Sequence, residues 1–248
     1  VAAGISERLR AVSQSMAHVE SPALLKGDVR LEHDSLGERE VPDQAYYGVQ
    51  TLRAIENFAI SGVFIKNFEH MIEALALVKK AAALANHELA VLDEDKMKAI
   101  CKACDELLAG KLHDQFPVDM FQGGAGTSTN MNANEVIANR GLEILGHKKG
   151  EYEFLHPNDH VNYSQSTNDA YPTAIKLAVM LSLKDLLAAM GQLKDGLAEK
   201  AEEFADVLKM GRTENQDAVP MTLGQEFSAY AVMIESAALA LERTGDEF

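Results

Sequence analysis

An apolar stripe with helical spacing runs through the last third of the sequence and restricts the folds that this chain can adopt. After Pro172, apolar side chains recur mostly every three or four residues, at Ile175, Val179, Leu183, Leu186, Met190, Leu193, Leu197 and Phe204. Such spacing keeps one face of a long helix apolar over many turns, as in a helix bundle or a coiled coil. We expect this helix to end at Gly211, and we expect a mainly α fold.

Shorter helices are predicted on both sides of the long one. Strong helix formers with apolar spacing predict a helix over about residues 71–90, and acidic residues at 93–95 followed by Gly110 mark the two ends of another. A third helix is expected from about Asn132 to Leu145. A last helix begins at the capping-box pattern Thr222-Leu223-Gly224-Gln225 and continues to the final residue.

Three parts of different character follow one another along the chain. Residues 1–28 are polar and predict a loosely attached tail. Residues 29–165 predict an N-terminal helical domain with short strand elements, because 29–33 alternate in polarity and 34–67 combine Gly, Pro, Asp and aromatic residues typical of loops. Residues 166–248 predict the start of a central helix-bundle domain that is truncated, because the last helix shows no stop signal.

The charge balance excludes some classes of partner. The chain carries a formal net charge of −15, whereas nucleic acids and anionic membranes bind clustered Lys and Arg. No apolar run approaches the roughly 18 residues that a membrane-spanning helix needs, and the first residues lack the apolar segment of a secretory signal. We therefore expect no nucleic-acid partner, no membrane partner and a cytoplasmic location.

The two cysteines, Cys101 and Cys104, form a C-x-x-C pair. Such pairs serve redox chemistry or zinc binding in other proteins. Here the pair lies in a helical stretch without a preceding strand, and the sequence has no second pair to complete a zinc site. We expect two structural thiols in a reducing compartment.

Polar islands at residues 122–132, 156–169 and 211–220 interrupt the apolar helical sequence. The first, QGGAGTSTNMN, combines glycines that permit close backbone approach with uncharged hydroxyl and amide donors. In the second, Ser166, Thr167, Asn168 and Asp169 stand directly before the longest helix, where one cap suffices and the others favour an anion site. Seen alone, each island is also consistent with an ordinary loop or a connection between helices.

His156 and His160 in the second island raise the alternative of a metal site. Pro157 between them argues against a helical face that carries both, so we expect no metal. The sequence also lacks the phosphate-binding loop, the dinucleotide fingerprint, H-E-x-x-H and G-x-S-x-G. These absences argue against nucleotide hydrolysis, dinucleotide redox chemistry, zinc proteolysis and α/β-hydrolase chemistry.

Together and in this order, the islands resemble the aspartase/fumarase superfamily from about Val29 to Gln225. The segments that are similar nearly letter for letter are AYYGVQTLRAIENF, DQFPVDMFQGGAGTSTNMNANEVIAN, GHKKGEY, HPNDHVN, SQSTNDAYPTA and QDAVPMTLGQEF. GGAGTSTNMN, STNDAYPT and QDAVPMTLGQEF look more like the aspartase branch, since class II fumarases typically read SGTQTNMN, SSND and QDATPLTLGQEF there. HPNDHVN is common to both branches.

This resemblance implies an almost all-helical homotetramer with each active site built from three subunits. It implies reversible deamination of L-aspartate to fumarate and ammonia, in which a serine on a mobile loop takes the Cβ proton and an enediolate forms. Neutral donors would bind this small dicarboxylate substrate, without a metal or organic cofactor. By motif match the substrate-binding residues would be Thr127, Ser166, Thr167, Asn168 and Thr213, with Glu214 at the next position.

Two departures from the family pattern matter. The Gly-Ser-Ser loop that carries the base serine is not in these residues, so we expect it beyond Phe248 and expect no catalytic base in this chain. Glu214-Asn215 stands where the family usually has His or Gln after the threonine. A carboxylate there repels a dianion or accepts a hydrogen bond from a substrate ammonium. A fumarate hydratase, and an inactive fragment or assembly module, stay open as alternatives.

Overall fold

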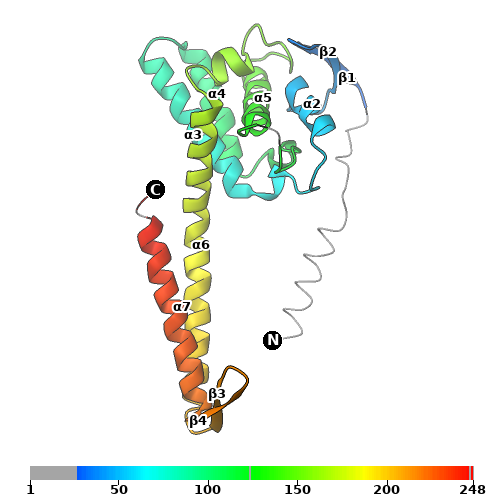
Figure 1. Cartoon of the computed structure of the whole chain (residues 1–248). Helices are drawn as coiled ribbons and strands as arrows, with labels where there is room; N and C mark the ends of the chain where they lie inside the picture. Colours follow the sequence, from blue (N-terminus) through cyan, green and yellow to red (C-terminus); the bar gives the residue numbers. More distant parts are fainter. Residues whose placement is uncertain (1–26, 123, 246, 248) are drawn as a thin grey trace. The chain divides into compact units, whose positions relative to one another are not determined.

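The computed structural model of the chain describes residues 27–122, 124–245 and 247 (Figure 1). Within them helices dominate, which confirms the predicted mainly α class. The chain packs into two compact units, the first ending at Ala178 and the second beginning at Val179. The predicted tail lies outside the described residues except for residues 27 and 28. The predicted division into tail, N-terminal domain and bundle domain stays a prediction.

The first unit opens with a β-hairpin. Strands β1 (Val29–Asp34) and β2 (Gly37–Pro42) pair antiparallel, with Val29 opposite Pro42 and Asp34 opposite Gly37. The strand predicted at residues 29–33 is confirmed. The prediction that 34–67 forms only loops is wrong, because β2, α2 (Val49–Asn57) and the 3-10 turn η1 (Ile65–Asn67) lie there. These elements are too short for a clear period.

Helices α3 (Glu69–Glu88), α4 (Glu94–Leu108) and α5 (Thr127–Ile144) form the core of the first unit, with the short helices η2 (His113–Gln115) and η3 (Pro157–Val161) beside them. Asp93 caps α4 by accepting a 2.9 Å hydrogen bond from the Lys96 N–H. Gly110 follows α4 with a φ of 78°, as the predicted stop requires. Both ends of this helix are thus confirmed.

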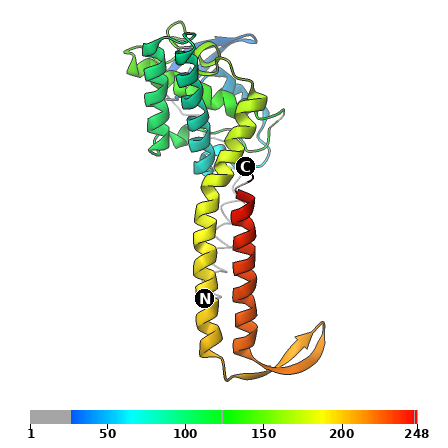
Figure 2. The ribbon, with the colours of Figure 1, turned by 90° about the vertical axis from the view of Figure 1, so that its left-hand side faces the viewer.

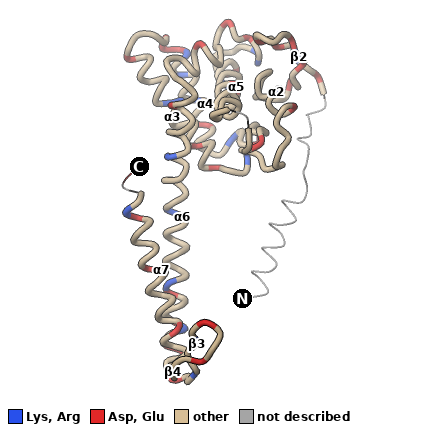
Figure 3. Tube along the Cα trace, in the orientation of Figure 1, with Lys and Arg blue, Asp and Glu red and all other residues tan. Residues whose placement is uncertain are grey.

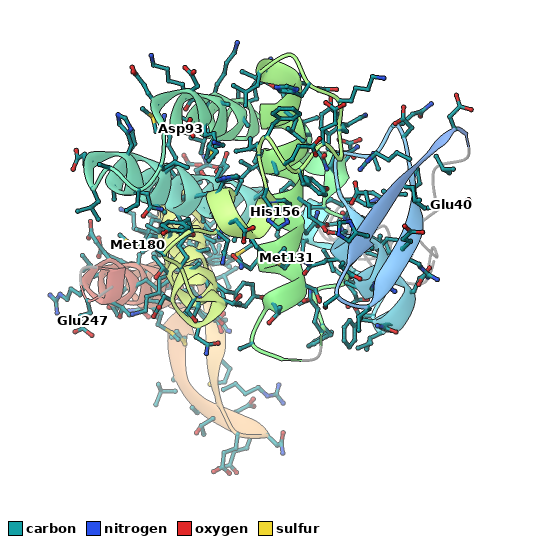
Figure 4. All side chains as sticks on the ribbon, turned by 90° about the horizontal axis from the view of Figure 1, so that it is seen from above. Glu40, Asp93, Met131, His156, Met180 and Glu247 are labelled. Carbon is teal, nitrogen blue, oxygen red and sulfur yellow. The ribbon has the colours of Figure 1, made fainter. Side chains whose placement is uncertain are left out.

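Helix α5 lies at the centre of the first unit and is buried on nearly every side. It begins at Thr127, earlier than the predicted Asn132, because its polar first turn packs against other elements instead of forming a loop. The apolar core around it includes Ile72, Leu75, Ile100, Ile137 and Leu142. Figure 4 looks onto this unit, with Met131 marking the first half of α5. Fully buried polar side chains on α5 are those of Thr129, Asn130, Asn132, Asn134, Glu135 and Asn139.

The second unit is a helical pair joined by a β-hairpin. Helix α6 (Thr167–Glu203) contributes its part from Val179 onward, and α7 (Leu223–Gly245) runs alongside it (Figures 1 and 2). Strands β3 (Leu208–Thr213) and β4 (Gln216–Thr222) connect the two helices. The long helix predicted from the apolar stripe is confirmed. It ends at Glu203, however, and not at the predicted Gly211.

Gly211 serves the hairpin instead of ending a helix. It lies at the irregularity of register between Met210 and Arg212, and a Cβ there would stand 2.9 Å from the Val219 carbonyl oxygen. The third island is therefore a strand pair within the connection between helices. The capping box at the start of α7 is confirmed: Thr222 N–H donates to Gln225 Oε1 at 3.0 Å, and Gln225 N–H donates to Thr222 Oγ1 at 3.1 Å.

Acidic and basic residues occur on elements of both units (Figure 3). Across the part of the chain that the structure describes, no helix is long and apolar enough to cross a membrane.

Candidate active site

The first turns of α5 and α6 meet in the first unit. Asn130 on α5 donates a 3.1 Å hydrogen bond from Nδ2 to Oγ1 of Thr167, the first residue of α6. Gly126, directly before α5, packs so closely on the Tyr171 ring of α6 that a Cβ would stand 2.2 Å from a ring carbon. The structure therefore brings Thr127 and the segment Ser166–Asn168 to neighbouring helix starts.

Both helix starts present uncharged donors to solvent. Thr127 is exposed and follows Gly126, whose φ of 83° turns the chain into α5. Ser166 and Asn168 are exposed, and Thr167 is half-buried. The Ser166 hydroxyl accepts a 3.2 Å hydrogen bond from the Asn168 N–H, so Ser166, one of several cap candidates in the sequence, caps α6. The free N–H groups of a helix start carry partial positive charge, which favours an anion.

A buried polar network lies beneath Thr167. Lys79 of α3 is fully buried and donates from Nζ to Asn162 Oδ1 at 2.8 Å and to Gln165 Oε1 at 2.9 Å. Asn162 Oδ1 also accepts from Nδ2 of Asn130 at 3.1 Å. Burial lowers the pKa of Lys79 to about 7. The network thus connects α3, α5 and the segment that leads into α6.

The loop before α5 is fixed by a carboxylate. Asp119 Oδ2 accepts backbone N–H groups of Ser61 at 2.7 Å and Gly62 at 2.9 Å, and Oδ1 accepts the Phe121 N–H at 2.8 Å. These hydrogen bonds outweigh burial, which acts in the opposite direction, so the pKa of Asp119 lies below its ordinary value. Gln122 donates from Nε2 to Thr129 Oγ1 at 2.7 Å and so ties the first island to α5.

Glu135 fixes the opposite side of α5 to the start of α2. Its Oε2 accepts N–H groups of Gly48 at 2.9 Å and Thr51 at 3.0 Å, and its Oε1 accepts that of Gln50 at 2.8 Å. Burial and, to a smaller extent, the nearby charge of Glu32 raise the pKa of Glu135 to about 7. A Cβ on Gly48 would stand 2.9 Å from Glu135 Cδ, so this close approach requires glycine.

The two histidines of the second island bind backbone groups. His156 Nδ1 accepts the N–H groups of Asn158 at 3.1 Å and Asp159 at 3.2 Å, which caps η3. His160 Nδ1 accepts the His156 N–H at 2.7 Å. No group of three His, Cys, Asp or Glu side chains among the described residues is arranged to hold a metal ion. Figure 4 labels His156 near α5.

An open groove of about 1050 Å³ passes these histidines. Its wall includes Ser128 of α5, Arg53 of α2, and both His156 and His160. Arg53 is held by Asp34 through hydrogen bonds of 2.9 and 3.0 Å. The groove is thus polar and lies beside the first turn of α5.

Thr213 and Glu214 belong to the second unit. Thr213 ends β3 and pairs with Gln216, which leaves Glu214 and Asn215 as the two loop residues of the hairpin. Glu214 has a φ of 51°, in the left-handed region, and its side chain is exposed. The six candidate residues are therefore divided between the units, four in the first and two in the second.

Lys79, Asn130 and Asn162 were not among the residues chosen from the sequence. Lys79 could have been found, because it interrupts the apolar spacing of α3 directly after Val78. Both asparagines lie inside the polar islands, but the motif match that selected the candidate residues did not include them. Cys101 and Cys104 are free thiols on α4, as expected for structural cysteines.

A protein family described as a lyase matches residues 37–246 of this sequence. The chain belongs to this lyase family. Aspartate ammonia-lyase of Helicobacter pylori strain J99 is 61% identical over 207 residues, which make up 84% of this chain and 44% of that protein. Aspartate ammonia-lyase of Escherichia coli K12 is 56% identical over 223 residues, or 90% of this chain and 47% of that protein.

Two solved structures share this fold. A Brucella melitensis protein described as fumarate lyase:delta crystallin superposes with a TM-score of 0.85 at 54% identity, over 88% of this chain and 51% of that one. Class II fumarase of Schistosoma mansoni superposes with a TM-score of 0.76 at 38% identity, over 85% of this chain and 44% of that one. The resemblance to the aspartase/fumarase superfamily is confirmed. The chain spans about half the length of the curated relatives it matches.

Proposed function

We propose that the complete protein is an aspartate ammonia-lyase and that these 248 residues supply part of its substrate site. Relatives that are 56% and 61% identical carry this name. The observation that carries the proposal is the 3.1 Å hydrogen bond from Asn130 to Thr167, because it joins two helix starts rich in uncharged donors. Such preorganised donors suit a dicarboxylate that gains further charge during the reaction.

The proposed reaction begins with removal of the Cβ proton of L-aspartate by a base outside this chain. The electron pair of that C–H bond moves into the adjacent carboxylate, which becomes an enediolate. The enediolate then collapses, the Cα–N bond breaks with its electrons on nitrogen, and the ammonium group leaves as ammonia. Thr127, Ser166, Thr167, Asn168 and Thr213 donate hydrogen bonds to the substrate carboxylates and stabilise this charge.

We further infer a cytoplasmic homotetramer, in which several subunits complete each site. Support comes from the second unit, whose helices leave large apolar side chains exposed. These include Val179, Met180, Leu186, Leu193, Val232, Met233 and Leu239. An exposed apolar surface of this kind marks an interaction site. Sedimentation of the complete protein measures the oligomeric state, and a monomer would contradict this part of the proposal.

Fumarate hydration is the second candidate, supported by the likeness to the Schistosoma mansoni fumarase. The two functions are separated by substrate. Fumarate formation from L-aspartate and from L-malate, followed by ultraviolet absorbance on the complete protein, is the direct test. We expect conversion of aspartate with release of ammonia and little conversion of malate. Preference for malate would replace the first proposal with the second.

The site itself is tested by Thr167→Val and Asn168→Ala in the complete protein. Loss of one preorganised donor typically costs about 10²-fold or more in turnover. We expect kcat/KM to fall by about that factor while the thermal midpoint changes little. Activity within a few-fold of the original enzyme would show that both residues serve only as helix caps.

A further inference from the structure

Lys79 lies fully buried on α3, and it can only donate hydrogen bonds while it is charged. Its Nζ reaches two neutral amide oxygens, Asn162 Oδ1 at 2.8 Å and Gln165 Oε1 at 2.9 Å. Among the described residues it forms no salt bridge. A buried ammonium group of this kind costs desolvation energy, so its position calls for a specific role.

The ammonium group determines which way the amides around it point. While Lys79 is charged it requires acceptors, so the oxygen of Asn162 faces it, and Asn162 Nδ2 donates to the Gln165 carbonyl at 3.1 Å. An oxygen in this place accepts from Nδ2 of Asn130 at 3.1 Å and Nδ2 of Asn134 at 3.2 Å. Three donors therefore converge on one oxygen.

Asn130 passes this orientation on to Thr167. Its Nδ2 carries two hydrogens, one directed at Asn162 Oδ1 and one at Thr167 Oγ1, both at 3.1 Å. Because Thr167 Oγ1 accepts from Asn130, its own hydroxyl hydrogen is free to point elsewhere. The exposed neighbours of Thr167 are Ser166 and Asn168 at the helix start, where the proposed substrate carboxylate binds.

We propose that Lys79 is a positioning residue that orients the Thr167 hydroxyl as a donor toward the substrate, acting through Asn162 and Asn130. This inference rests on the proposed function of the site and extends it by a residue that touches no substrate. Without the ammonium group, the side-chain amides of Asn162 and Asn130 can rotate so that their oxygen and nitrogen atoms exchange places. Asn130 then offers its oxygen to Thr167, and the hydroxyl donates inward instead of toward the carboxylate.

The test is a double-mutant cycle in the complete protein, with Lys79→Met, Thr167→Val and the combination. Lys79→Met keeps length and burial but removes the donor. Loss of one preorganised donor typically costs about 10²-fold, and we expect Lys79→Met to lower kcat/KM by about 10- to 100-fold, mostly through kcat. If Lys79 acts through the Thr167 hydroxyl, Lys79→Met causes little further loss of kcat/KM once Thr167 is Val. If the two residues act independently, the free-energy losses of the two single variants add in the double variant. Additive losses would overturn the proposal.

A matched control is Lys80→Met, one residue along α3, where the exposed ammonium group pairs with Asp105. It should leave kcat/KM unchanged. Lys79→Gln provides the second variant, because an amide donates and accepts and so cannot enforce one orientation. We expect it to lose activity as Lys79→Met does, and full activity of the Gln variant would overturn the proposal.

A readout without substrate separates this inference from the proposed function. Backbone hydrogen exchange of the ligand-free complete protein is followed over residues 162–170, with α7 as an internal reference. We expect exchange over 162–170 to rise about tenfold in Lys79→Met, as expected when about 1.4 kcal/mol of local stability is lost, with α7 unaffected. If the protein acts on neither aspartate nor malate, the proposed function is wrong, yet the exchange measurement still tests whether Lys79 holds the segment 162–170 in place. Unchanged exchange would overturn the positioning role.

Discussion

Glu135 shows how one buried side chain fixes two elements of the first unit. It lies within α5, and its carboxylate accepts the three backbone N–H groups of Gly48, Gln50 and Thr51 at the start of α2. Those N–H groups have no partner within their own helix, so the carboxylate satisfies donors that would otherwise be buried unpaired. An amide in this place cannot accept three such hydrogen bonds.

We expect Glu135→Gln to destabilise the first unit. The Gln amide nitrogen would face N–H donors of α2, and each unsatisfied buried donor costs about 1–3 kcal/mol. Urea unfolding followed by circular dichroism measures the loss. Glu88→Gln at the exposed end of α3 is the control and should change the free energy of unfolding very little. Equal stability of both variants would contradict the role assigned to Glu135.

The same variant predicts a pH dependence. Burial raises the pKa of Glu135 from 4.5 to about 7, so the folded state holds this proton more tightly than the unfolded state. Its contribution to stability is complete below about pH 4.5 and is lost as pH rises through about 7. The stability difference between the original protein and Glu135→Gln should therefore shrink from about pH 5 to about pH 8. A constant or growing difference would contradict the raised pKa.

Glu214 occupies the first loop position of the β3–β4 hairpin with a left-handed φ of 51°. We infer that its carboxylate accepts a hydrogen bond from the substrate ammonium, which is worth about 1.5–3 kcal/mol. Glu214→Gln should then lower kcat/KM for L-aspartate by roughly 10- to 100-fold, while malate inhibition stays level or strengthens. Asp217→Asn removes the same charge from the same hairpin and is the control. Equal weakening of aspartate turnover and of malate inhibition in Glu214→Gln would contradict a hydrogen bond between Glu214 and the substrate ammonium.

At single positions, the sequence revealed the polar islands but not how the buried polar groups connect them. Thr127 and Ser166–Asn168 could be chosen because uncharged donors cluster where helices begin. Lys79 and Glu135 lie inside helices, where an isolated polar residue is usually solvent-exposed and so does not stand out in the sequence. Only the folded contacts show that each binds groups from distant segments.

The start of α7 depends on its capping box, in which Thr222 and Gln225 exchange two hydrogen bonds. Thr222→Ala removes the hydroxyl acceptor and leaves the Gln225 N–H without it. Loss of such a cap typically costs about 1 kcal/mol. We expect the free energy of unfolding to fall by about that amount, and Thr222→Ser to restore most of it. A Ser variant as unstable as the Ala variant would show that the methyl group matters instead.

Helices were predicted where period and caps agree, as for α4 with Asp93 and Gly110 at its ends. The β3–β4 hairpin was missed because its loop, Glu214-Asn215, lacks the glycine that usually marks a two-residue turn. Its strands are also exposed along most of their length, so they show little alternation in polarity. The strand conformation of these residues therefore depends on their pairing with each other and not on local sequence preference.

The two units differ in how much apolar surface they bury by themselves. The first has a large core around α3, α4 and α5. In the described part of the second, Ala231 is the one apolar side chain that is buried, while α6 and α7 expose many others. The apolar stripe predicts helices with an apolar face that must pack against another surface. The sequence of these residues does not identify that surface.

The 248-residue chain by itself should have no lyase activity, because the proposed base lies outside it and its candidate donors are hydroxyl and amide groups. A threonine hydroxyl or an asparagine amide does not abstract a carbon-bound proton near neutral pH, which requires a general base of suitable pKa. We expect no fumarate from L-aspartate with the purified chain, and conversion by the complete protein under the same conditions. Adding excess chain to the complete protein controls for inhibitors in the preparation. Ammonia release that persists after repurification of the chain would place a base among these residues and contradict the division of roles proposed above.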